Sequence, residues 1–425
     1  GEPLYGYYNS SDDYVIRKHI ELLITAGVDF LVFDTTNAVT YDTVYQKIMK
    51  IIDEYLQAGW DAPKVAFYTH SYSIQTANKL YENVYKANYY PNTWYLVDGK
   101  PLIMAYTDTE KDKAVSGDAN YNPEPLSQEF LDFFTIMRPQ WPDEQYYADG
   151  FPWLEWKYPQ PEHSGIMNVS VASHPGVPFS FSITRPGWLN WGRGYNPITG
   201  VNNSDKVNEG LFFQYCWDTV HAEDPDTVFV TGWNEWIALK TLYDGEYMLC
   251  DAANLEYSRD IEMMKGGYND AFFIQLIQNV RQFKGTEADT NTINPQTIDI
   301  DGDIAQWDEV GTIYRNIGDI SYGRDYRGCT VRVKYSMEAP RNNLQTIKTA
   351  HDDEYIYFLI QADNDITAPG DETNWCNILI GTGDPSLKGW ESYEYIINRS
   401  VNRNTSSIES LGENFSCTEV GQAEI

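Results

Sequence analysis

The chain has 425 residues, which suits either two domains or one large barrel with an appendage. Asp and Glu number 62 against 30 Lys and Arg, and the formal net charge of −32 argues against a nucleic-acid partner and an anionic membrane surface. Hydrophobic residues make up 42% of the chain, enough for a core, and no run approaches the roughly 18 apolar residues that span a bilayer.

Short apolar runs alternate with longer amphipathic stretches over the first two thirds of the chain, a pattern typical of βα units. Helical spacing is clearest in residues 11–26 and 43–56. The runs that we predict as strands are residues 4–8, 30–35, 65–70, 102–106, 134–138, 152–156, 166–172 and 228–233. Eight strands of this kind over about 285 residues predict a (β/α)₈ TIM-type barrel, whose active site lies at the C-terminal ends of the strands.

The pattern changes after the last predicted barrel helix, residues 270–284. Residues 286–296 are polar and read as a linker. Beyond it, short alternating runs such as 330–335 and 355–361 are separated by Gly, Asn and Asp clusters. We therefore predict a barrel in residues 1–285 followed by an all-β sandwich in residues 297–425.

The five cysteines form no C-x-x-C pair, so they predict neither a zinc knuckle nor a disulfide framework. Three histidines near strand ends share no short spacing, and we predict no metal site and no cofactor in the barrel. In the second domain, the acidic residues at 352–354, 363 and 365 are candidates for a structural Ca²⁺ site, with solvated turns as the alternative. Oligomeric state is left open.

A carboxylate between two indoles ends the eighth predicted strand, in the run Thr231-Gly232-Trp233-Asn234-Glu235-Trp236. Aromatic residues form 15% of the chain, and flat rings beside carboxylates suit a surface that handles sugars; an acidic surface over an aromatic core is the alternative. We assign Glu235 as a catalytic residue, with Trp233, Asn234 and Trp236 as substrate contacts.

This run resembles the corresponding strand end of glycoside hydrolase families 99 and 71 and of related bacterial polysaccharide-synthesis proteins. Weaker matches are Phe33-Asp34, Trp153-Leu154-Glu155-Trp156 and Ser170-Val171-Ala172. In family 99 the pattern reads Asn-Glu-Trp-x-Glu-Gly and both glutamates act on the bond cleaved; Glu235 matches the first, but Ala238 stands at the second. Glycosidases need two carboxyl groups, about 5 Å apart when retaining and about 6.5–9.5 Å apart when inverting, so the resemblance requires a partner from elsewhere.

Two other predicted strand ends offer that partner. Asp34 follows an apolar strand at the barrel rim, although a structural hydrogen-bonding role is the alternative. Glu155 lies between Trp153 and Trp156, where desolvation raises a carboxyl pKa and suits a general acid; an outward ion pair is the alternative. Loop carboxylates, Glu162, Glu246 and Asp251 among them, rank lower because an acidic chain carries many.

Further substrate contacts are expected at strand ends and in the long loop after the seventh strand. They are Tyr68, His70, Trp153, Trp156, His174, Trp191 and Arg193. The long loop also carries Arg185, Trp188 and Tyr195, and packing over the open end of the barrel is the alternative to glycan subsites. The charged run at residues 256–262 is interpreted as an ion-pair network that fixes its loop.

The second domain opens with Ile300-Asp301-Gly302-Asp303-Ile304-Ala305-Gln306-Trp307, which resembles the first segment of family 9 carbohydrate-binding modules. In that comparison Trp307 is a core anchor, and Trp375 and Trp390 are candidates for stacking on a sugar. Burial in the core is the alternative for both.

The leading hypothesis is a secreted, periplasmic or cell-surface glycoside hydrolase whose substrate is a polysaccharide or complex glycan; the chain given lacks a signal segment, which we expect to have been removed. Ala238 motivates an alternative, a glycan-binding protein on a degenerate barrel. A glycosyltransferase ranks last, because the Asp299-Ile300-Asp301 spacing lies in the second domain and no diphosphate-binding loop is placed at a strand end.

Overall fold

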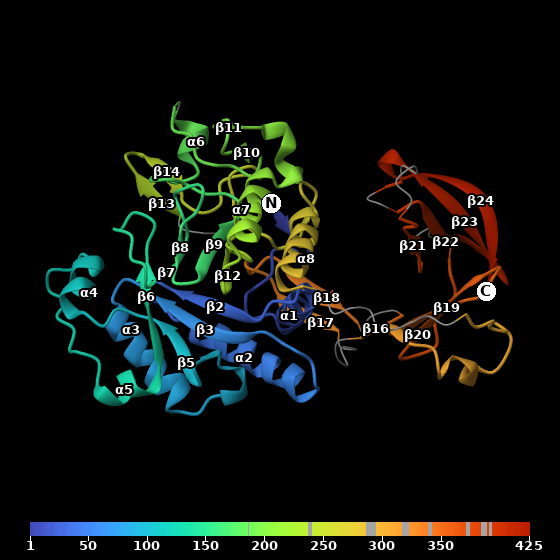
Figure 1. The fold of residues 1–425 in the computed structure, drawn as a ribbon, viewed down its shortest axis with the longest axis horizontal. Coiled ribbons are helices and arrows are strands. Elements are labelled where there is room, and N and C mark those ends of the chain that lie inside the picture. The colour runs from blue at the N-terminus through green and yellow to red at the C-terminus, as the bar shows by residue number, and fades with distance from the viewer. Residues whose placement is uncertain are drawn as a thin grey trace. The chain divides into compact units, whose positions relative to one another are not determined.

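The computed structural model describes residues 1–185, 187–236, 240–285, 295–316, 323–338, 342–370, 375–383, 389–390 and 393–425 (Figure 1). The chain divides into two compact units. The first comprises Gly1–Ala288 and Tyr322–Glu338, and the second comprises Asp289–Ser321 and Ala339–Ile425. Ala238 and residues 286–294 of the predicted linker lie outside the described residues.

The first unit is a mixed α/β domain. Its helices are α1 (Asp13–Ala26), α2 (Asp42–Gln57), α3 (Ser73–Leu80), α4 (Thr109–Ser116), α5 (Gln128–Phe133), α6 (Phe181–Thr184), α7 (Leu211–Glu223) and α8 (Ala271–Lys284). Its strands are β1 (Glu2–Pro3), β2 (Phe30–Thr35), β3 (Lys64–Thr69), β4 (Leu96–Val97), β5 (Lys100–Met104), β6 (Thr135–Gln140), β7 (Gly150–Pro152), β8 (Glu162–His163), β9 (Ile166–Ser170), β10 (Tyr195–Asn196), β11 (Val201–Asn202), β12 (Thr227–Thr231), β13 (Lys240–Tyr243), β14 (Glu246–Leu249), β15 (Met264–Lys265), β17 (Arg324–Arg327) and β18 (Lys334–Met337).

The main sheet is parallel and runs in the order β2-β3-β5-β6-β7, with the short β4 added to β5. Strands β9 and β12 form a second parallel pair, with β8 antiparallel at its edge. Helices flank these strands in the ribbon (Figure 1). The parallel order confirms the predicted TIM-type α/β class.

The first predicted strand, residues 4–8, is wrong. Here Gly6, with φ at 79°, donates its backbone N–H to Pro3 in a turn, and strand pairing is limited to β1 with β15. The sixth predicted strand, residues 152–156, is misplaced, because β7 ends at Pro152 and Trp153 to Trp156 follow in a loop.

Side chains that alternate along the parallel strands form a buried interior. This cluster contains Ala66, Tyr68, Leu102, Met104, Phe151 and Ile166, with Phe30, Val32, Trp153 and Phe229 packed against it. Alternation places Asp34 on the same side of β2 as Phe30 and Val32, at the C-terminal end of the strand. The strand period therefore directs Asp34 toward the open end of the interior.

The opposite sides of β9 and β12 pack against α7 and α8. Phe212, Trp217 and Phe272 are nearly inaccessible to solvent there and contact Val169 of β9 in one hydrophobic cluster. Burying side chains of this size stabilises the fold by about 2–3 kcal/mol each. This packing fixes the strand from which Glu235 projects.

The hairpin β17–β18 belongs to the first unit, although the sequence placed residues 297–425 in the second domain. The Arg324 Nε atom pairs with Asp12 Oδ2 at 2.7 Å, and both side chains are buried. Arg324 Nη1 also donates to the Tyr5 carbonyl at 2.8 Å. Asp12 is the N-cap of α1, so the hairpin adds to the support of that helix start. The contacting residues are far apart in the sequence, so the hydrophobic periodicity of the chain cannot predict that they meet.

The second unit contains two antiparallel sheets. The first is β16 (Thr312–Arg315), β19 (Leu344–His351) and β20 (Ile356–Ala362), and the second is β21 (Ile378–Ile380), β22 (Tyr395–Asn402), β23 (Thr405–Gly412) and β24 (Ser416–Glu424). Trp307 is 6% exposed and packs with Ile298 and Ala350, as expected of a core anchor. The sandwich arrangement stays a prediction. Across the described part of the chain, every helix is too short or too polar to cross a membrane.

Candidate active site

Glu235 lies just beyond the C-terminal end of β12, on the side of the barrel where the strands end. Its side chain keeps 44% of its surface exposed, and its Oε2 atom lies 3.7 Å from Arg259 Nη2. Its backbone N–H donates to the carboxylate of Asp260. Glu235 is therefore fixed at its backbone, and its side chain is partly exposed.

Arg259 brings two carboxyl groups together. Its Nη2 atom pairs with Asp251 Oδ1 and also faces Glu235 Oε2 at 3.7 Å, so the two carboxyl groups lie on either side of one guanidinium nitrogen. A third carboxyl group, Asp34, is held at the end of β2, where its Oδ1 accepts from the Thr36 N–H at 2.9 Å. We call Glu235, Asp251, Asp34 and Arg259 the carboxylate cluster.

Burial and neighbouring charges raise the pKa of Glu235. Loss of water on burial contributes most, followed by the negative charge of Asp251, and Arg259 offsets part of the effect. The result is a pKa of about 8 against an ordinary 4.5, so Glu235 keeps its proton at neutral pH. Burial and the charge of Asp251 also raise the pKa of Asp34, although hydrogen bonds from Thr36 work against the rise.

His174 and Cys250 complete the surroundings of Arg259. Arg259 Nη1 donates to His174 Nδ1 at 2.6 Å, and because an Arg nitrogen can only donate, the His174 proton must lie on Nε2. Nε2 faces the Cys250 sulfur at 3.7 Å. Burial and the Arg259 charge lower the pKa of His174 to about 3, so it stays neutral.

The nearest set of potential metal ligands is His174, Cys250 and Asp251, whose ligand atoms lie within 4.8 Å of one another. The Arg259 guanidinium already contacts two of the three, and its donation to Nδ1 leaves a proton on the Nε2 atom that a cation would need. The donor set therefore suits a guanidinium better than a metal ion.

The motif residues on either side of Glu235 are held by one buried carboxylate, Glu262. Asn234 Nδ2 donates to Glu262 Oε2 at 2.8 Å, and Trp236 Nε1 donates to the same oxygen at 2.6 Å. Both residues were predicted as substrate contacts. Their side-chain N–H groups are occupied by Glu262 and, for Asn234, also by the Tyr8 hydroxyl, and the Trp236 ring packs against the hydrophobic cluster that contains Phe212 and Phe272.

Two residues from the start of the chain complete the Glu262 site. The Tyr8 hydroxyl donates to Glu262 Oε2 at 2.6 Å, and His19 Nε2 lies 3.0 Å from Oε1. Burial alone would raise the pKa of Glu262, yet hydrogen bonds from His19, Tyr8 and Trp236 lower it below its ordinary value. The charged run at residues 256–262 thus forms the expected ion pair at Arg259 and also anchors the motif.

Glu155, the other predicted catalytic carboxylate, is paired elsewhere. It is 8% exposed, and its Oε1 lies 2.8 Å from His163 Nε2. The other ring nitrogen of His163 bonds to the Tyr147 carbonyl at 2.8 Å. An ion pair was the alternative that the sequence left open for Glu155, but the pair is buried rather than outward.

Several predicted contacts form an aromatic stack on the barrel side. His70 stacks on Trp141 with ring centroids 4.3 Å apart, and Trp141 is parallel to Trp153 at 6.0 Å. Trp156 meets the His174 ring edge-to-face at 5.7 Å, which brings it beside the carboxylate cluster. The sequence did not single out Trp141, which follows β6 at its C-terminal end and could have been found from that position.

Other predicted contacts are structural. Tyr68 is fully buried and donates its hydroxyl to the Phe151 carbonyl at 2.8 Å, because its position in β3 points inward. Arg193 is also fully buried, and its Nη2 donates to Ser258 Oγ at 2.9 Å and the Asp260 carbonyl at 2.7 Å. Neither residue reaches a substrate in this arrangement.

Trp191 and Trp233, which the sequence predicted as substrate contacts, pack against other aromatic rings of the first unit. Trp191 stacks on Tyr195 at 5.5 Å and packs against Phe212. Trp233 meets His19 at 5.5 Å and Phe273 at 6.0 Å. Both rings therefore pack against other aromatic residues over part of their surface.

In the second unit, the candidate glycan-binding tryptophans remain predictions. Trp375 Nε1 donates to the Thr367 carbonyl at 2.7 Å, and Trp390 meets Phe415 edge-to-face at 4.9 Å. Asp352 accepts two backbone N–H groups, from Glu354 and Tyr355, each at 2.8 Å. That arrangement is a turn, the alternative given for the calcium candidate.

No protein-family model matches the chain, and no curated protein matches its sequence. Among solved structures, it is similar to the GH99 endo-alpha-mannosidase from Bacteroides thetaiotaomicron, with 14% identity over 67% of this chain and 83% of that chain and a TM-score of 0.38. The complex of that enzyme with bis-tris-propane gives 14% identity, 67% and 88% coverage and a TM-score of 0.36.

A structure described as a glycoside hydrolase-like protein gives 13% identity, 66% coverage of this chain and 89% of that chain, and a TM-score of 0.39. The neighbours named by this comparison are thus glycoside hydrolases or proteins described as like them. At this level of identity and TM-score, the similarities assign no activity to this chain.

Proposed function

We propose that the protein is a glycoside hydrolase that acts on a polysaccharide or complex glycan, with Glu235 as its general acid. One observation supports this most: a half-exposed glutamate with a pKa of about 8 lies beside two further carboxyl groups at the end of the barrel strands. A protonated carboxyl group at neutral pH is what a glycosidic oxygen needs as it leaves.

Asp251 is the best partner in the cluster. Its bond to Arg259 holds it as an ion pair, and it shares the Arg259 Nη2 atom with Glu235, so the two carboxyl groups lie close together, as a glycosidase pair must. The anion at Asp251 would act on the sugar or on water while Glu235 protonates the leaving oxygen. The predicted partner Asp34 is the second candidate, and its raised pKa favours the neutral form.

The test is hydrolysis of a panel of α-mannans, α-glucans and other plant and host glycans, measured as released reducing ends. Wild-type protein is expected to cleave at least one member. Glu235→Gln, which keeps the shape but cannot donate the proton, should lower kcat by about 10³-fold. Asp251→Asn should lower it by a similar factor.

Glu155→Gln is the matched control, because Glu155 lies in the same Trp-x-Glu-Trp local sequence but is paired with His163. It should retain turnover within about twofold per folded molecule. If Glu235→Gln cleaves at the wild-type rate, Glu235 is not the acid. Binding of a glycan by wild-type protein without release of any sugar would instead support the non-catalytic alternative.

A further inference from the structure

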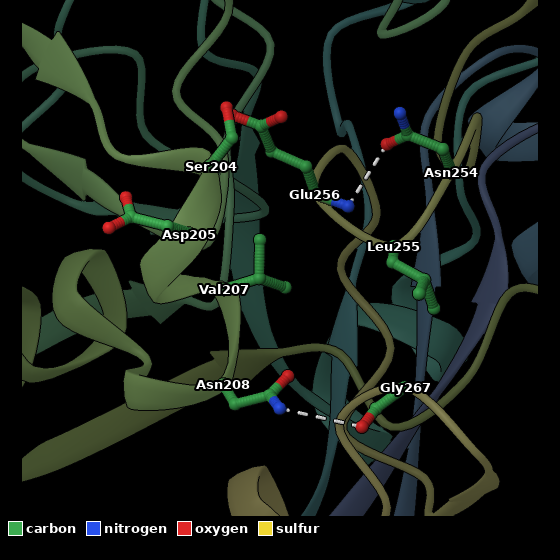
Figure 2. A pocket seen from close by; sticks show the side chains of 8 residues that line it. All are labelled: Ser204, Asp205, Val207, Asn208, Asn254, Leu255, Glu256 and Gly267. Carbon is green, nitrogen blue, oxygen red and sulfur yellow. Dashed lines mark hydrogen bonds between the residues drawn. The ribbon is translucent and has the colours of Figure 1, made fainter.

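The first unit contains a pocket whose lining residues do not belong to the carboxylate cluster. It has a volume of about 510 Å³ and is formed by two walls, the 3₁₀ helix η3 (Ser204–Glu209) and residues 254–256, with Gly267 at one end (Figure 2). The Asn208 side chain donates to the Gly267 carbonyl at 3.5 Å, which closes that end. We call this the η3 pocket.

The lining of the η3 pocket has the chemistry of a site for a neutral sugar. Asp205, Asn208 and Glu256 present carboxylate and amide groups that bond hydroxyls, and Val207 and Leu255 supply an apolar surface (Figure 2). The eight lining residues include no Lys or Arg, so an anionic sugar would meet two carboxylates and no cation. Leu255 keeps 40% of its surface exposed, as a wall open to a ligand does.

The wall at residues 254–256 is the tip of a loop whose base lies in the carboxylate cluster. Residues 251–259 fold back on themselves through a bridge between Ala252 and Ser258, and the Ala253 N–H donates to the Tyr257 carbonyl at 2.8 Å. Asp251 and Arg259 stand at the two ends of this loop. Leu255, four residues from Asp251, is therefore at most about 13 Å along the chain from the cluster.

The tip is rigid, because it is tied to the elements around it. Asn254 Oδ1 accepts the N–H groups of Glu256 at 3.0 Å and Tyr257 at 2.7 Å. The Arg193 N–H donates to the Glu256 carbonyl at 2.9 Å, and Ser204 Oγ donates to the Glu256 carboxylate at 3.1 Å. The pocket is thus preformed, which lowers the entropy cost of binding.

We propose that the η3 pocket is a second glycan-binding subsite, which holds a neutral sugar unit of the same chain that reaches Glu235. This rests on the proposed function, since it extends the substrate from one linkage to a polymer that spans both sites. The 251–259 loop then contacts one substrate at two places. Its tip, residues 254–256, binds a distant sugar unit, and its base holds Asp251 at the carboxylate cluster.

The experiment measures binding without turnover. The full chain carrying Glu235→Gln is run through native gels containing α-mannan, α-glucan, β-glucan or, as the anionic probe, polygalacturonate. Leu255→Trp in that background fills the pocket, and Leu242→Trp, at another exposed leucine on β13, is the matched control. We expect at least one neutral polysaccharide to retard the parent and the control, with an apparent Kd about fivefold higher for Leu255→Trp.

Asp205→Ala, at an exposed position of η3, provides a second variant if Leu255→Trp does not fold. Equal retardation of the parent and both pocket variants overturns the proposal, as does retardation by polygalacturonate alone or by none of the polymers. Because binding is read without cleavage, loss of retardation in the pocket variants supports the subsite even if wild-type protein proves to have no hydrolase activity.

Discussion

Two glutamates in this protein have nearly the same local sequence and different surroundings. Glu155 in Trp153-Leu154-Glu155-Trp156 and Glu235 in Trp233-Asn234-Glu235-Trp236 each follow a barrel strand. Glu155 is buried against His163 at 2.8 Å, whereas Glu235 is half-exposed with Arg259 no closer than 3.7 Å. The indoles alone therefore do not decide whether such a carboxyl group is available for chemistry.

The difference comes from the loops that reach each strand end. His163, on the short strand β8, supplies a partner that satisfies Glu155. The loop after β12 instead returns Asp251, Arg259 and Asp260 to Glu235, and burial there, followed by the charge of Asp251, raises the pKa of Glu235. A satisfied pair stabilises a fold, while crowded like charges keep a proton ready for transfer.

Removing Glu155 should produce the largest change in stability. Glu155→Ala leaves His163 buried without its acidic partner, and we expect the free energy of unfolding to fall by about 3 kcal/mol. Glu235→Ala should not lower it at neutral pH, because the folded state raises the pKa of Glu235 and so gains nothing from the ionised side chain. Urea unfolding followed by tryptophan fluorescence measures both.

The opposite result would assign the catalytic role to Glu155 and not to Glu235. If Glu155→Ala unfolds at the wild-type urea concentration and loses turnover, Glu155 is a working carboxyl group and its contact with His163 is a catalytic pair. Thermal unfolding of the same variants checks that turnover is compared between folded proteins.

Glu262 tests whether Glu235 depends on its anchored neighbours. In Glu262→Gln, one acceptor becomes an amide donor that faces Asn234 and Trp236, so the motif should shift and kcat should fall by about tenfold with little change in KM. Glu209→Gln, in an exposed i,i+3 pair with Lys206, is the matched control and should change neither. A rise in KM of about tenfold with constant kcat would mean that Glu262 acts on substrate binding and not on the position of Glu235.

The sequence predicts much of this region and misses its connections. The strand period places Asp34 and Glu235 at the same end of the barrel, because residues that alternate along parallel strands share one interior. It cannot distinguish Glu155 from Glu235, because the partner that separates them lies on another element. Asp251, a low-ranked candidate, and Glu262 lie in a loop without periodicity, so only the fold brings them to the motif.

The hairpin β17–β18 shows the same limit at the level of domains. The strand predicted at residues 330–335 overlaps only the start of β18, and β17 was not predicted. The buried pair of Arg324 with Asp12 joins positions that are 312 residues apart. Composition placed it with the second domain, and the ion pair places it with the first. Local pattern indicates part of the hairpin, while its place in the first unit depends on long-range contacts.

A pH dependence tests the protonation of Glu235. The folded state holds the proton on Glu235 to about pH 8, while the ordinary pKa of 4.5 applies when the chain unfolds. Folding therefore takes up a proton between these values, and the stability that Glu235 contributes falls as pH rises from 4.5 to 8. Glu235→Gln cannot titrate, so its free energy of unfolding relative to wild type should increase over this range in urea titrations at successive pH values. Turnover by wild type should decline with a midpoint near pH 8, because the folded protein loses the acid form of Glu235 there. A wild-type advantage that instead grows with pH would mean that the folded state lowers the pKa of Glu235, as it does for Glu262, and would make it an anchored anion and not the acid.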